Sequence, residues 1–273
     1  MRNPTGKRMG FSNMAIPGFD NNRTDDAHIN GFDSRLQSTA AAIVDIGRKF
    51  RPAVFACSFS IEDCVLLDLL ATHAPQVEVV TLDTGRLPQE THDLIAEYAG
   101  RGLPIRVLAP DAGDVEAWTA EYGVNGFRDS LQARQACCHV RKVLPLNRAL
   151  AGKRAWITGL RRVQSGDRRS LPAEFCDAER GMHKFNPLID WSNQDVRRYA
   201  LEHRLPVHAL YAQGYASIGC APCTRAVAAG EDARAGRWWW EDQTVKECGL
   251  HASPVQRQVE NRAENQTENQ AAA

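Results

Sequence analysis

Two pairs of cysteines have spacings that suit metal binding. Cys137 and Cys138 are adjacent, and Cys220 and Cys223 form a Cys-x-x-Cys pair in a stretch rich in small residues. Thiolates are soft ligands that favour zinc or iron–sulfur clusters. Adjacent side chains diverge, so two sequential thiolates would strain a single zinc site, whereas the separated irons of a cluster accept one each. The pattern therefore favours a 4Fe-4S cluster over zinc.

Spacing alone leaves two alternatives open. The adjacent pair is compatible with chance, and the Cys-x-x-Cys pair with a dithiol redox site. Cys57 and Cys64 have apolar neighbours and are expected in the core. Cys176 lies in a polar segment with no other cysteine nearby, so we assign it no role in a site.

The eighth cysteine is a candidate nucleophile. Cys248 lies in the string Glu247-Cys248-Gly249-Leu250-His251. Positive neighbours raise the thiolate fraction of a cysteine, and Lys246 and His251 are the nearest in sequence. Such a thiolate can attack electrophilic sulfur and retain the transferred group as an S-sulfonate. An exposed thiol without a role is the alternative.

Arginines are placed to bind an oxyanion. Arg234 and Arg237 are three residues apart, so on a helical turn they share a face and can grip sulfate and phosphate oxygens together. A second arginine-dense stretch covers residues 161–169, where Arg162, Arg168 and Arg169 are candidates. A solvated charged loop is the simpler interpretation of that stretch.

Strand-length apolar runs alternate with helix-length segments along most of the chain. This alternation predicts right-handed parallel crossovers, and hence an α/β fold with a doubly wound, mostly parallel sheet. The expected strands are 53–57, 77–82, 105–108 and 155–158, and the expected helices begin at 61, 88, 114, 140 and 192.

Polar residues follow three of these strands. In an open parallel sheet the ligand crevice lies beyond the carboxyl ends of the strands, next to helix N-termini. The residues expected there, for contacts to an anion, a ribose or an adenine, are Ser58, Ser60, Leu82, Asp83, Thr84 and Gly159.

Length and composition limit the possible organisation. We expect a disordered leader over 1–30, one domain over 31–251 with a mobile C-terminal segment from about 224, and a disordered tail over 252–273. The formal net charge is zero, which argues against bulk attraction to nucleic acid or an anionic membrane. We see neither a secretion signal nor an apolar run of roughly 18 residues, so a cytoplasmic, reducing location is expected.

Three motifs resemble those of one enzyme family. Residues 58–63 (Ser-Phe-Ser-Ile-Glu-Asp) resemble the degenerate pyrophosphatase loop of sulfonucleotide reductases, which belong with the ATP pyrophosphatases and share their adenine nucleotide alpha-hydrolase-like fold. The two cysteine pairs are similar to the cluster pattern of the assimilatory adenylyl sulfate reductases. The string 247–251 resembles the catalytic Glu-Cys-Gly-Leu-His of that family.

The resemblance implies an activity: thioredoxin-dependent reduction of adenosine 5'-phosphosulfate to sulfite and AMP, in sulfate assimilation and cysteine biosynthesis. It implies an S-sulfonate on Cys248, a 4Fe-4S cluster, and a thioredoxin or glutaredoxin-like partner. Lys142 would bridge cluster and substrate, and Arg234, Arg237 and an arginine of 161–169 would bind substrate. The oligomeric state is open, with a homo-oligomer allowed.

Three competing functions remain. A reductase for the 3'-phosphorylated nucleotide is nearest, although in that family such enzymes typically lack the four cysteines. An ATP pyrophosphatase that modifies RNA needs a glycine-rich loop, where this chain has Phe59 and Ile61. A non-enzymatic iron–sulfur or zinc sensor is the third.

Overall fold

A computed structural model describes residues 26–164, 168–178 and 180–241. The described chain divides into two compact units. Among the described residues, the first unit combines residues 26–109 with 146–239, and the second combines Pro110–Pro145 with Trp240 and Glu241. None of the helices in the described ranges has the length and apolar character needed to cross a membrane.

The first unit is built on a six-stranded sheet with the order β3-β2-β1-β4-β6-β5. All neighbouring strands are parallel except β5, which runs antiparallel to β6 at the edge. This confirms the expected mostly parallel α/β sheet. The strands are β1 (Ala53–Ala56), β2 (Glu78–Leu82), β3 (Ile105–Leu108), β4 (Ala155–Ile157), β5 (Glu174–Asp177) and β6 (Met182–Phe185).

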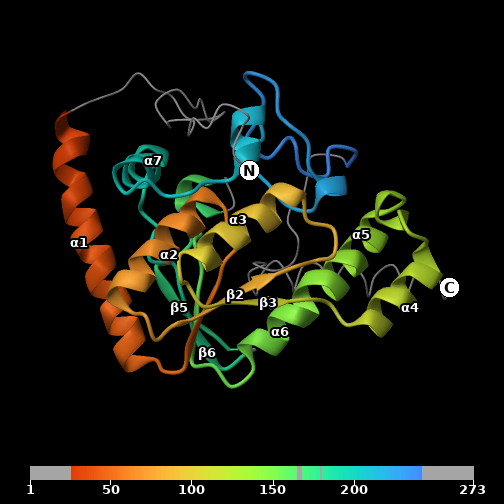
Figure 1. The fold of residues 1–273 in the computed structure, drawn as a ribbon, viewed down its shortest axis with the longest axis horizontal. Coiled ribbons are helices and arrows are strands. Elements are labelled where there is room, and N and C mark those ends of the chain that lie inside the picture. Colours follow the sequence, from red (N-terminus) through yellow and green to blue (C-terminus); the bar gives the residue numbers. More distant parts are fainter. Residues whose placement is uncertain (1–25, 165–167, 179, 242–273) are drawn as a thin grey trace. The chain divides into compact units, whose positions relative to one another are not determined.

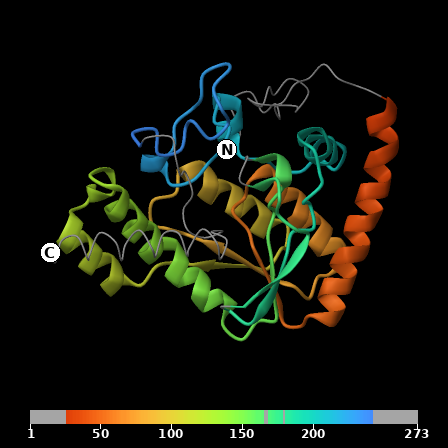
Figure 2. The ribbon, with the colours of Figure 1, turned by 180° about the vertical axis from the view of Figure 1, so that it is seen from behind.

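The helices of this unit cover both faces of the sheet. Figures 1 and 2 show α2 and α3 on one side of the strands and α6 on the other. Alternate strand residues point to opposite faces, so Phe55 and Ile157 belong to one core while Val54 and Trp156 face the other side. The helices are α1 (Asp26–Lys49), α2 (Ile61–His73), α3 (Gln89–Gly100), α6 (Leu144–Leu150) and α7 (Asn193–Glu202).

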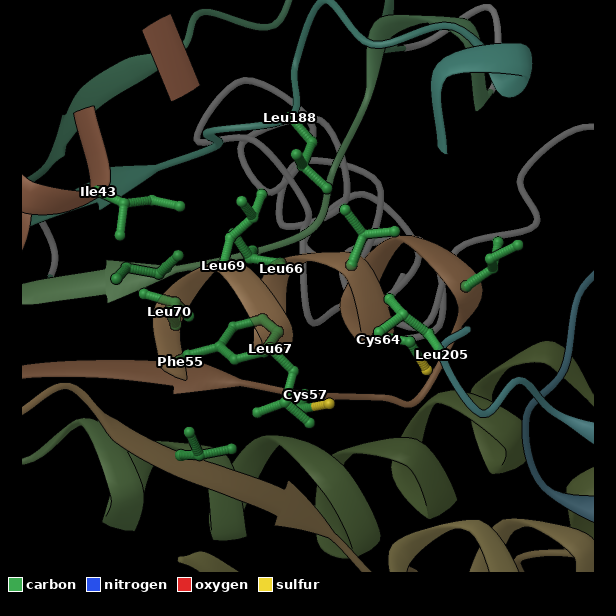
Figure 3. Close-up of a cluster of buried hydrophobic side chains, with 14 of the residues drawn as sticks. Ile43, Phe55, Cys57, Cys64, Leu66, Leu67, Leu69, Leu70, Leu188 and Leu205 are labelled. Carbon is green, nitrogen blue, oxygen red and sulfur yellow. The ribbon is translucent and has the colours of Figure 1, made fainter. Parts of the chain in front are cut away.

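A hydrophobic core lies between the sheet and helices α1, α2, α3 and α7. Figure 3 shows Leu66, Leu69 and Leu70 of α2 in one cluster with Phe55 of β1 and Leu188. Each of these five side chains is at most 2% exposed. Fully burying a side chain of this kind contributes about 1.5–3 kcal/mol, so this cluster fixes α2 against the carboxyl end of β1.

The second unit contains α4 (Ala112–Tyr122), a 3-10 turn (Gly126–Arg128) and α5 (Leu131–Cys138). A π-helical turn, His139–Val143, directly follows α5. Ser130 caps α5 by accepting a hydrogen bond from Ala133 N at 3.1 Å. The sequence indicates only a polar segment up to Gln135, and the Ser130 cap stabilises the start of the helix within that segment.

Three expectations about secondary structure need correction. Helix α1 was not anticipated, and it begins at Asp26, inside the stretch expected to be a leader. The β5–β6 hairpin was missed because both strands are short, and Cys176 lies on β5 rather than in a loop. The expected helix at 140 starts as the π-helical turn and becomes α6 only at Leu144.

Candidate active site

The loop after β1 is fixed by its own side chains. The Ser58 backbone N–H and hydroxyl both donate to Asp63 Oδ2 at 2.6 Å. Ser60 caps α2 by accepting from Asp63 N. Phe59 has a φ of 59°, in the left-handed region that favours glycine, and its side chain is fully buried. The loop thus reaches a glycine-like conformation without glycine, and burial of Phe59 offsets the cost.

Asp63 connects this loop with the end of β4. Strand order reverses between β1 and β4, which is where open α/β sheets bind ligands. A Cβ on Gly159 would lie 2.1 Å from Asp63 Oδ1, so glycine is required for this close approach. Burial raises the pKa of Asp63 to about 6, although hydrogen bonds from Ser58 favour its charged form. Ser58 and Gly159 therefore both lie against Asp63, at the adjoining carboxyl ends of β1 and β4.

Next to Asp63, Glu62 forms a buried ion pair with Arg161. Arg161 Nη2 lies 2.5 Å from Glu62 Oε1, and Arg161 is 2% exposed. The remaining Arg161 donors reach Trp191 O at 3.0 Å and Asn193 Oδ1 at 2.8 Å. Burial alone would raise the pKa of Glu62, but the Arg161 guanidinium lowers it overall. This arginine is saturated by protein acceptors, so its role is architectural.

The arginine-dense loop is attached to the same ion pair. Gln164 Nε2 donates to Glu62 Oε1 at 3.1 Å, and Gln164 Oε1 accepts from Arg168 Nη1 at 2.6 Å. Arg162 pairs with Asp190 and also donates to Leu171 O. Arg169 is exposed. Of the three predicted loop arginines, the structure thus connects Arg168 with the buried network and Arg162 with an exposed carboxylate.

The loop after β2 is the third strand-end loop of the candidate site, after those that follow β1 and β4. Asp83 Oδ1 accepts from Gly85 N at 2.9 Å, and Asp83 Oδ2 lies 3.1 Å from His92 Nε2. Leu82 ends β2 and is half-buried. His92, one turn into α3, supports Asp83 and was not predicted from the sequence. An acidic residue at a strand end followed by a histidine nine positions later is too weak a signal to identify beforehand.

The Cys220–Cys223 turn is bonded to this β2 loop. Thr84 Oγ1 lies 3.3 Å from Cys220 Sγ, and Thr84 is 1% exposed. Ala221 N donates to Arg86 O at 2.8 Å. Cys223 N donates to Cys220 O, which closes a short 3-10 turn. Both sulfurs belong to buried residues beside the candidate nucleotide loop, an arrangement suited to a soft metal group.

Arg237 completes this part of the site. Residues Thr224 and Arg237 form an isolated antiparallel bridge, and Trp238 N donates to Cys223 O at 3.2 Å. A Cβ on Gly219 would lie 2.4 Å from Arg237 Nη2, so the guanidinium packs directly against the residue before Cys220. Its Cζ lies 4.7 Å from the Trp238 ring centre.

The bonding of Arg237 is incomplete. The residue is 7% exposed and donates to Ile218 O at 3.3 Å. Its Nε has no hydrogen-bond partner, and no carboxylate pairs with it, within the part of the chain that the structure describes. A buried cation with spare donors is strongly stabilised by an anion. Arg234, three residues earlier, is half-buried and accepts at its carbonyl from Arg237 N.

The other cysteine pair lies in the second unit. Cys137 and Cys138 end α5, and each is 8% exposed. The π-helical turn that follows carries Arg141 and Lys142, which are also buried. π-helical turns frequently mark functional sites. Over residues 26–164, 168–178 and 180–241, no three potential metal ligands gather in one place, so the cluster expected from the sequence stays a prediction.

The predicted nucleophile, Cys248, lies outside the described residues, and so do the tail from 252 and most of the leader. The described chain ends at Glu241, after three tryptophans. Trp238 is 1% exposed and Trp239 is 39% exposed, so these consecutive tryptophans do not share one buried face.

Comparison with known proteins assigns the family. The model of the phosphoadenosine phosphosulfate reductase domain matches residues 52–226. The chain belongs to this reductase family. An adenosine 5'-phosphosulfate reductase from Agrobacterium fabrum is 48% identical over 233 residues, which are 85% of this chain and 88% of that protein. One from Allochromatium vinosum is 52% identical over 220 residues, which are 80% of this chain and 86% of that protein.

Solved structures support the family fold. Phosphoadenylyl-sulfate reductase from Candida auris, in a phosphate complex, aligns with a TM-score of 0.59 and 25% identity, covering 73% of this chain and 97% of that one. The FMN adenylyltransferase of Candida glabrata aligns with a TM-score of 0.53 at 14% identity, covering 89% of this chain and 85% of that one. The second match shows the adenine nucleotide alpha-hydrolase-like fold alone.

Proposed function

We propose that this protein reduces adenosine 5'-phosphosulfate to sulfite and AMP. The observation that carries the proposal is Arg237, a buried guanidinium beside the Cys220–Cys223 turn whose Nε has no partner among the described residues. Through Thr84 the same turn contacts the strand-end loops that make the nucleotide crevice. The adenosine 5'-phosphosulfate reductases that this chain resembles over at least four-fifths of its length support the choice of substrate.

The substrate ligands follow from the strand-end geometry. Ser58, Ser60 and Gly159 border the crevice between β1 and β4, and Leu82, Asp83 and Thr84 border it at β2. We assign the nucleotide to these residues. We assign its sulfate and phosphate oxygens to Arg234 and Arg237, with Lys142 and one arginine among Arg162, Arg168 and Arg169 as further cationic ligands.

The reaction needs a nucleophile and a reductant. The Cys248 thiolate attacks the sulfur of the sulfonucleotide, so that a sulfur–sulfur bond forms and the sulfur–oxygen bond to phosphate breaks. AMP leaves with the electron pair of that bond. A thiolate of thioredoxin or a glutaredoxin-like protein then attacks Cys248 Sγ and releases sulfite. Its second thiol resolves the mixed disulfide, which returns Cys248 as a thiol and leaves the reductant as a disulfide.

The four cysteines fit a 4Fe-4S cluster by the chemistry of their donors. All four belong to buried residues, the donor set is sulfur only, and the adjacent pair suits separate irons. When bound, the cluster would supply a fixed local charge that supports the anion site. Thr84 would then place its hydroxyl beside one ligand sulfur, and Lys142 would carry a buried cation four residues after Cys138.

Two experiments test the proposal. Cys248→Ser should abolish sulfite release and the S-sulfonate seen by mass spectrometry. Undiminished sulfite release from that variant would rule out the mechanism. Steady-state rates with both nucleotides should favour adenosine 5'-phosphosulfate, and a large preference for the 3'-phosphorylated form would assign that substrate instead.

The cluster has its own test. Iron and acid-labile sulfide, measured anaerobically, should both be present, together with the visible absorption of an iron–sulfur protein. A colourless zinc protein would exclude the cluster.

We assign the enzyme to the cytoplasm, where thioredoxin is available and thiols stay reduced. We assign it no nucleic-acid or membrane partner, in line with its zero net charge.

A further inference from the structure

A buried tyrosine bonds to the start of α2 from a distant part of the chain. Tyr211 lies in the 3-10 turn Ala209–Gln213 and is 4% exposed. Its hydroxyl oxygen accepts a hydrogen bond from Ile61 N at 3.0 Å, across 150 positions of sequence. Burial raises the pKa of Tyr211 well above its ordinary value, so the phenol is neutral. Both residues belong to the first unit, so this bond is a tertiary contact within that unit.

The bond fixes the end of the loop that follows β1. The first N–H groups of a helix have no partner within the helix. Ser60, the N-cap of α2, accepts from Asp63 N, and Tyr211 accepts from Ile61 N. Asp63 in turn accepts from the backbone and the hydroxyl of Ser58. Tyr211 therefore bonds to the same helix start that orders both serines of the loop.

The position of Tyr211 is fixed independently of that loop. Its ring packs against the ring of His208, with centres 6.3 Å apart and planes at 77°. His208 Nδ1 accepts from Leu210 N at 3.3 Å, so Nε2 carries the proton and donates to Thr91 Oγ1 at 2.8 Å. Burial lowers the pKa of His208 to about 4, in keeping with this neutral imidazole. Because Thr91 lies on α3, the turn that carries Tyr211 is anchored to that helix.

The same turn leads into the chain that carries Cys220 and Cys223. Gly214 ends the turn with a φ of 85°, and its carbonyl accepts from Val227 N at 3.0 Å. The Cys220–Cys223 turn lies within the segment that this bond closes. One short turn thus contacts the loop after β1 and also borders the segment with the cysteine pair.

We propose that Tyr211 is a positioning residue for nucleotide binding, and that its hydroxyl holds loop 58–60 in the conformation that binds AMP and adenosine 5'-phosphosulfate. The proposal rests on the proposed function, which assigns Ser58 and Ser60 to the nucleotide. Phe59, with a φ of 59°, has a conformation that residues with side chains rarely adopt, so the loop depends on contacts outside itself. The Tyr211 hydroxyl is bonded to the backbone of α2 and therefore acts through the loop.

Tyr211→Phe tests this proposal, because it removes the hydroxyl and keeps the ring. In the full-length protein, the Kd for AMP from isothermal titration calorimetry should rise about tenfold. The KM for adenosine 5'-phosphosulfate should rise by a similar factor while kcat changes less than about twofold, as expected when binding alone is weakened. By NMR, the Ile61 amide should exchange with solvent deuterium about tenfold faster, while the Leu66 amide inside α2 keeps its rate.

Tyr199→Phe is the matched control. Tyr199 is also a buried tyrosine, 3% exposed, whose hydroxyl bonds to a distant residue, Asp68 Oδ2, at 2.8 Å. The control should leave the AMP affinity and the KM unaltered.

Three outcomes would overturn the positioning role alone. One is faster exchange at Ile61 with unaltered AMP affinity in Tyr211→Phe, and another is unaltered exchange at Ile61 in that variant. The third is an equal loss of AMP affinity in Tyr199→Phe, since general loosening would then account for the effect. If the unaltered protein neither binds AMP nor reduces adenosine 5'-phosphosulfate, the proposed function itself fails, and the positioning role fails with it.

Discussion

Two buried arginines of the first unit differ in how their donors are used. Arg161 is 2% exposed and Arg237 is 7% exposed, so both guanidinium groups have lost most of their water. Arg161 donates to a carboxylate, a backbone carbonyl and a side-chain amide. Arg237 makes one long hydrogen bond, to Ile218 O, and its guanidinium packs against Gly219 and the Trp238 ring. The donors of Arg161 are bonded to acceptors within the protein, whereas the Nε of Arg237 has no partner among the described residues and can bind a ligand.

Two neighbouring carboxyl groups show the same contrast. Glu62 has a guanidinium beside it and a lowered pKa, while Asp63 has no cationic partner in the described chain and a pKa raised to about 6 by burial. A buried charge with an opposite charge beside it, such as Glu62 or Arg161, thus belongs to the framework, whereas the candidate anion site is identified by the cation Arg237, whose Nε has no partner among the described residues. Burial alone would not separate these roles.

The largest effect is expected from breaking the satisfied pair. Removing one partner of a buried ion pair leaves an uncompensated charge, so Arg161→Met should lower the free energy of unfolding by about 3–5 kcal/mol. Urea unfolding followed by tryptophan fluorescence under anaerobic conditions measures this. A loss below about 1 kcal/mol would mean that Arg161 is not part of the framework, and the contrast with Arg237 would disappear.

The matching change at Arg237 should give the opposite pattern. Arg237→Met removes a buried cation without a carboxylate partner in the described residues, so the free energy of unfolding should stay the same or rise. Losing a charge-assisted contact to the substrate should lower kcat/KM by about 10²–10³-fold. Unaltered kinetics with a strong loss of stability would assign Arg237 to the framework instead.

Part of the fold, and the strand-end position of several candidate site residues, could be predicted from the sequence. Strand–helix alternation predicts the parallel sheet, and the polar residues after β1, β2 and β4 lie at adjacent strand ends as expected. Local patterns suffice here, because strand ends and helix starts are defined by neighbours in sequence. The capping box of Ser192 and Asp195 at the start of α7 is another case.

Ion pairs between residues far apart in the chain could not be predicted from the sequence. Glu62 and Arg161 are 99 residues apart, and nothing in either segment distinguishes Arg161 from Arg162. Their different roles depend on which side chain points inward after Gly159, a question that packing decides. The short β5–β6 hairpin and the π-helical turn after Cys138 were missed because a few residues give no usable period.

The pH dependence of stability sharpens the contrast between the two carboxyl groups. The pKa of Asp63 is raised from 3.8 to about 6. The stabilisation that protonated Asp63 gives the folded state is therefore fully present below pH about 4 and is lost as the pH rises through about 6. At about 1.4 kcal/mol per pKa unit, the unfolding free energy of the unaltered protein relative to Asp63→Asn should fall by about 2–3 kcal/mol between pH 4 and 7.

Urea titrations of both proteins at several pH values provide that measurement. Glu62→Gln serves as the comparison. The pKa of Glu62 is lowered, so the stabilisation that Glu62 contributes should increase with pH, opposite to that of Asp63. If the difference in unfolding free energy between the unaltered protein and Asp63→Asn is constant with pH, the pKa of Asp63 is not raised, and a nearby positive charge must offset its burial.

The smallest effect is expected at the arginine next to Arg161. Arg162 pairs with Asp190, but its side chain is 36% exposed and that of Asp190 is 64% exposed. Because water screens exposed pairs, Arg162→Ala should change the free energy of unfolding by about 1 kcal/mol or less. Its kinetic effect is the more informative measurement: an increased KM at unaltered stability would place Arg162 among the substrate ligands beside Arg237. A stability loss as large as that of Arg161→Met would show that exposure does not separate the two arginines.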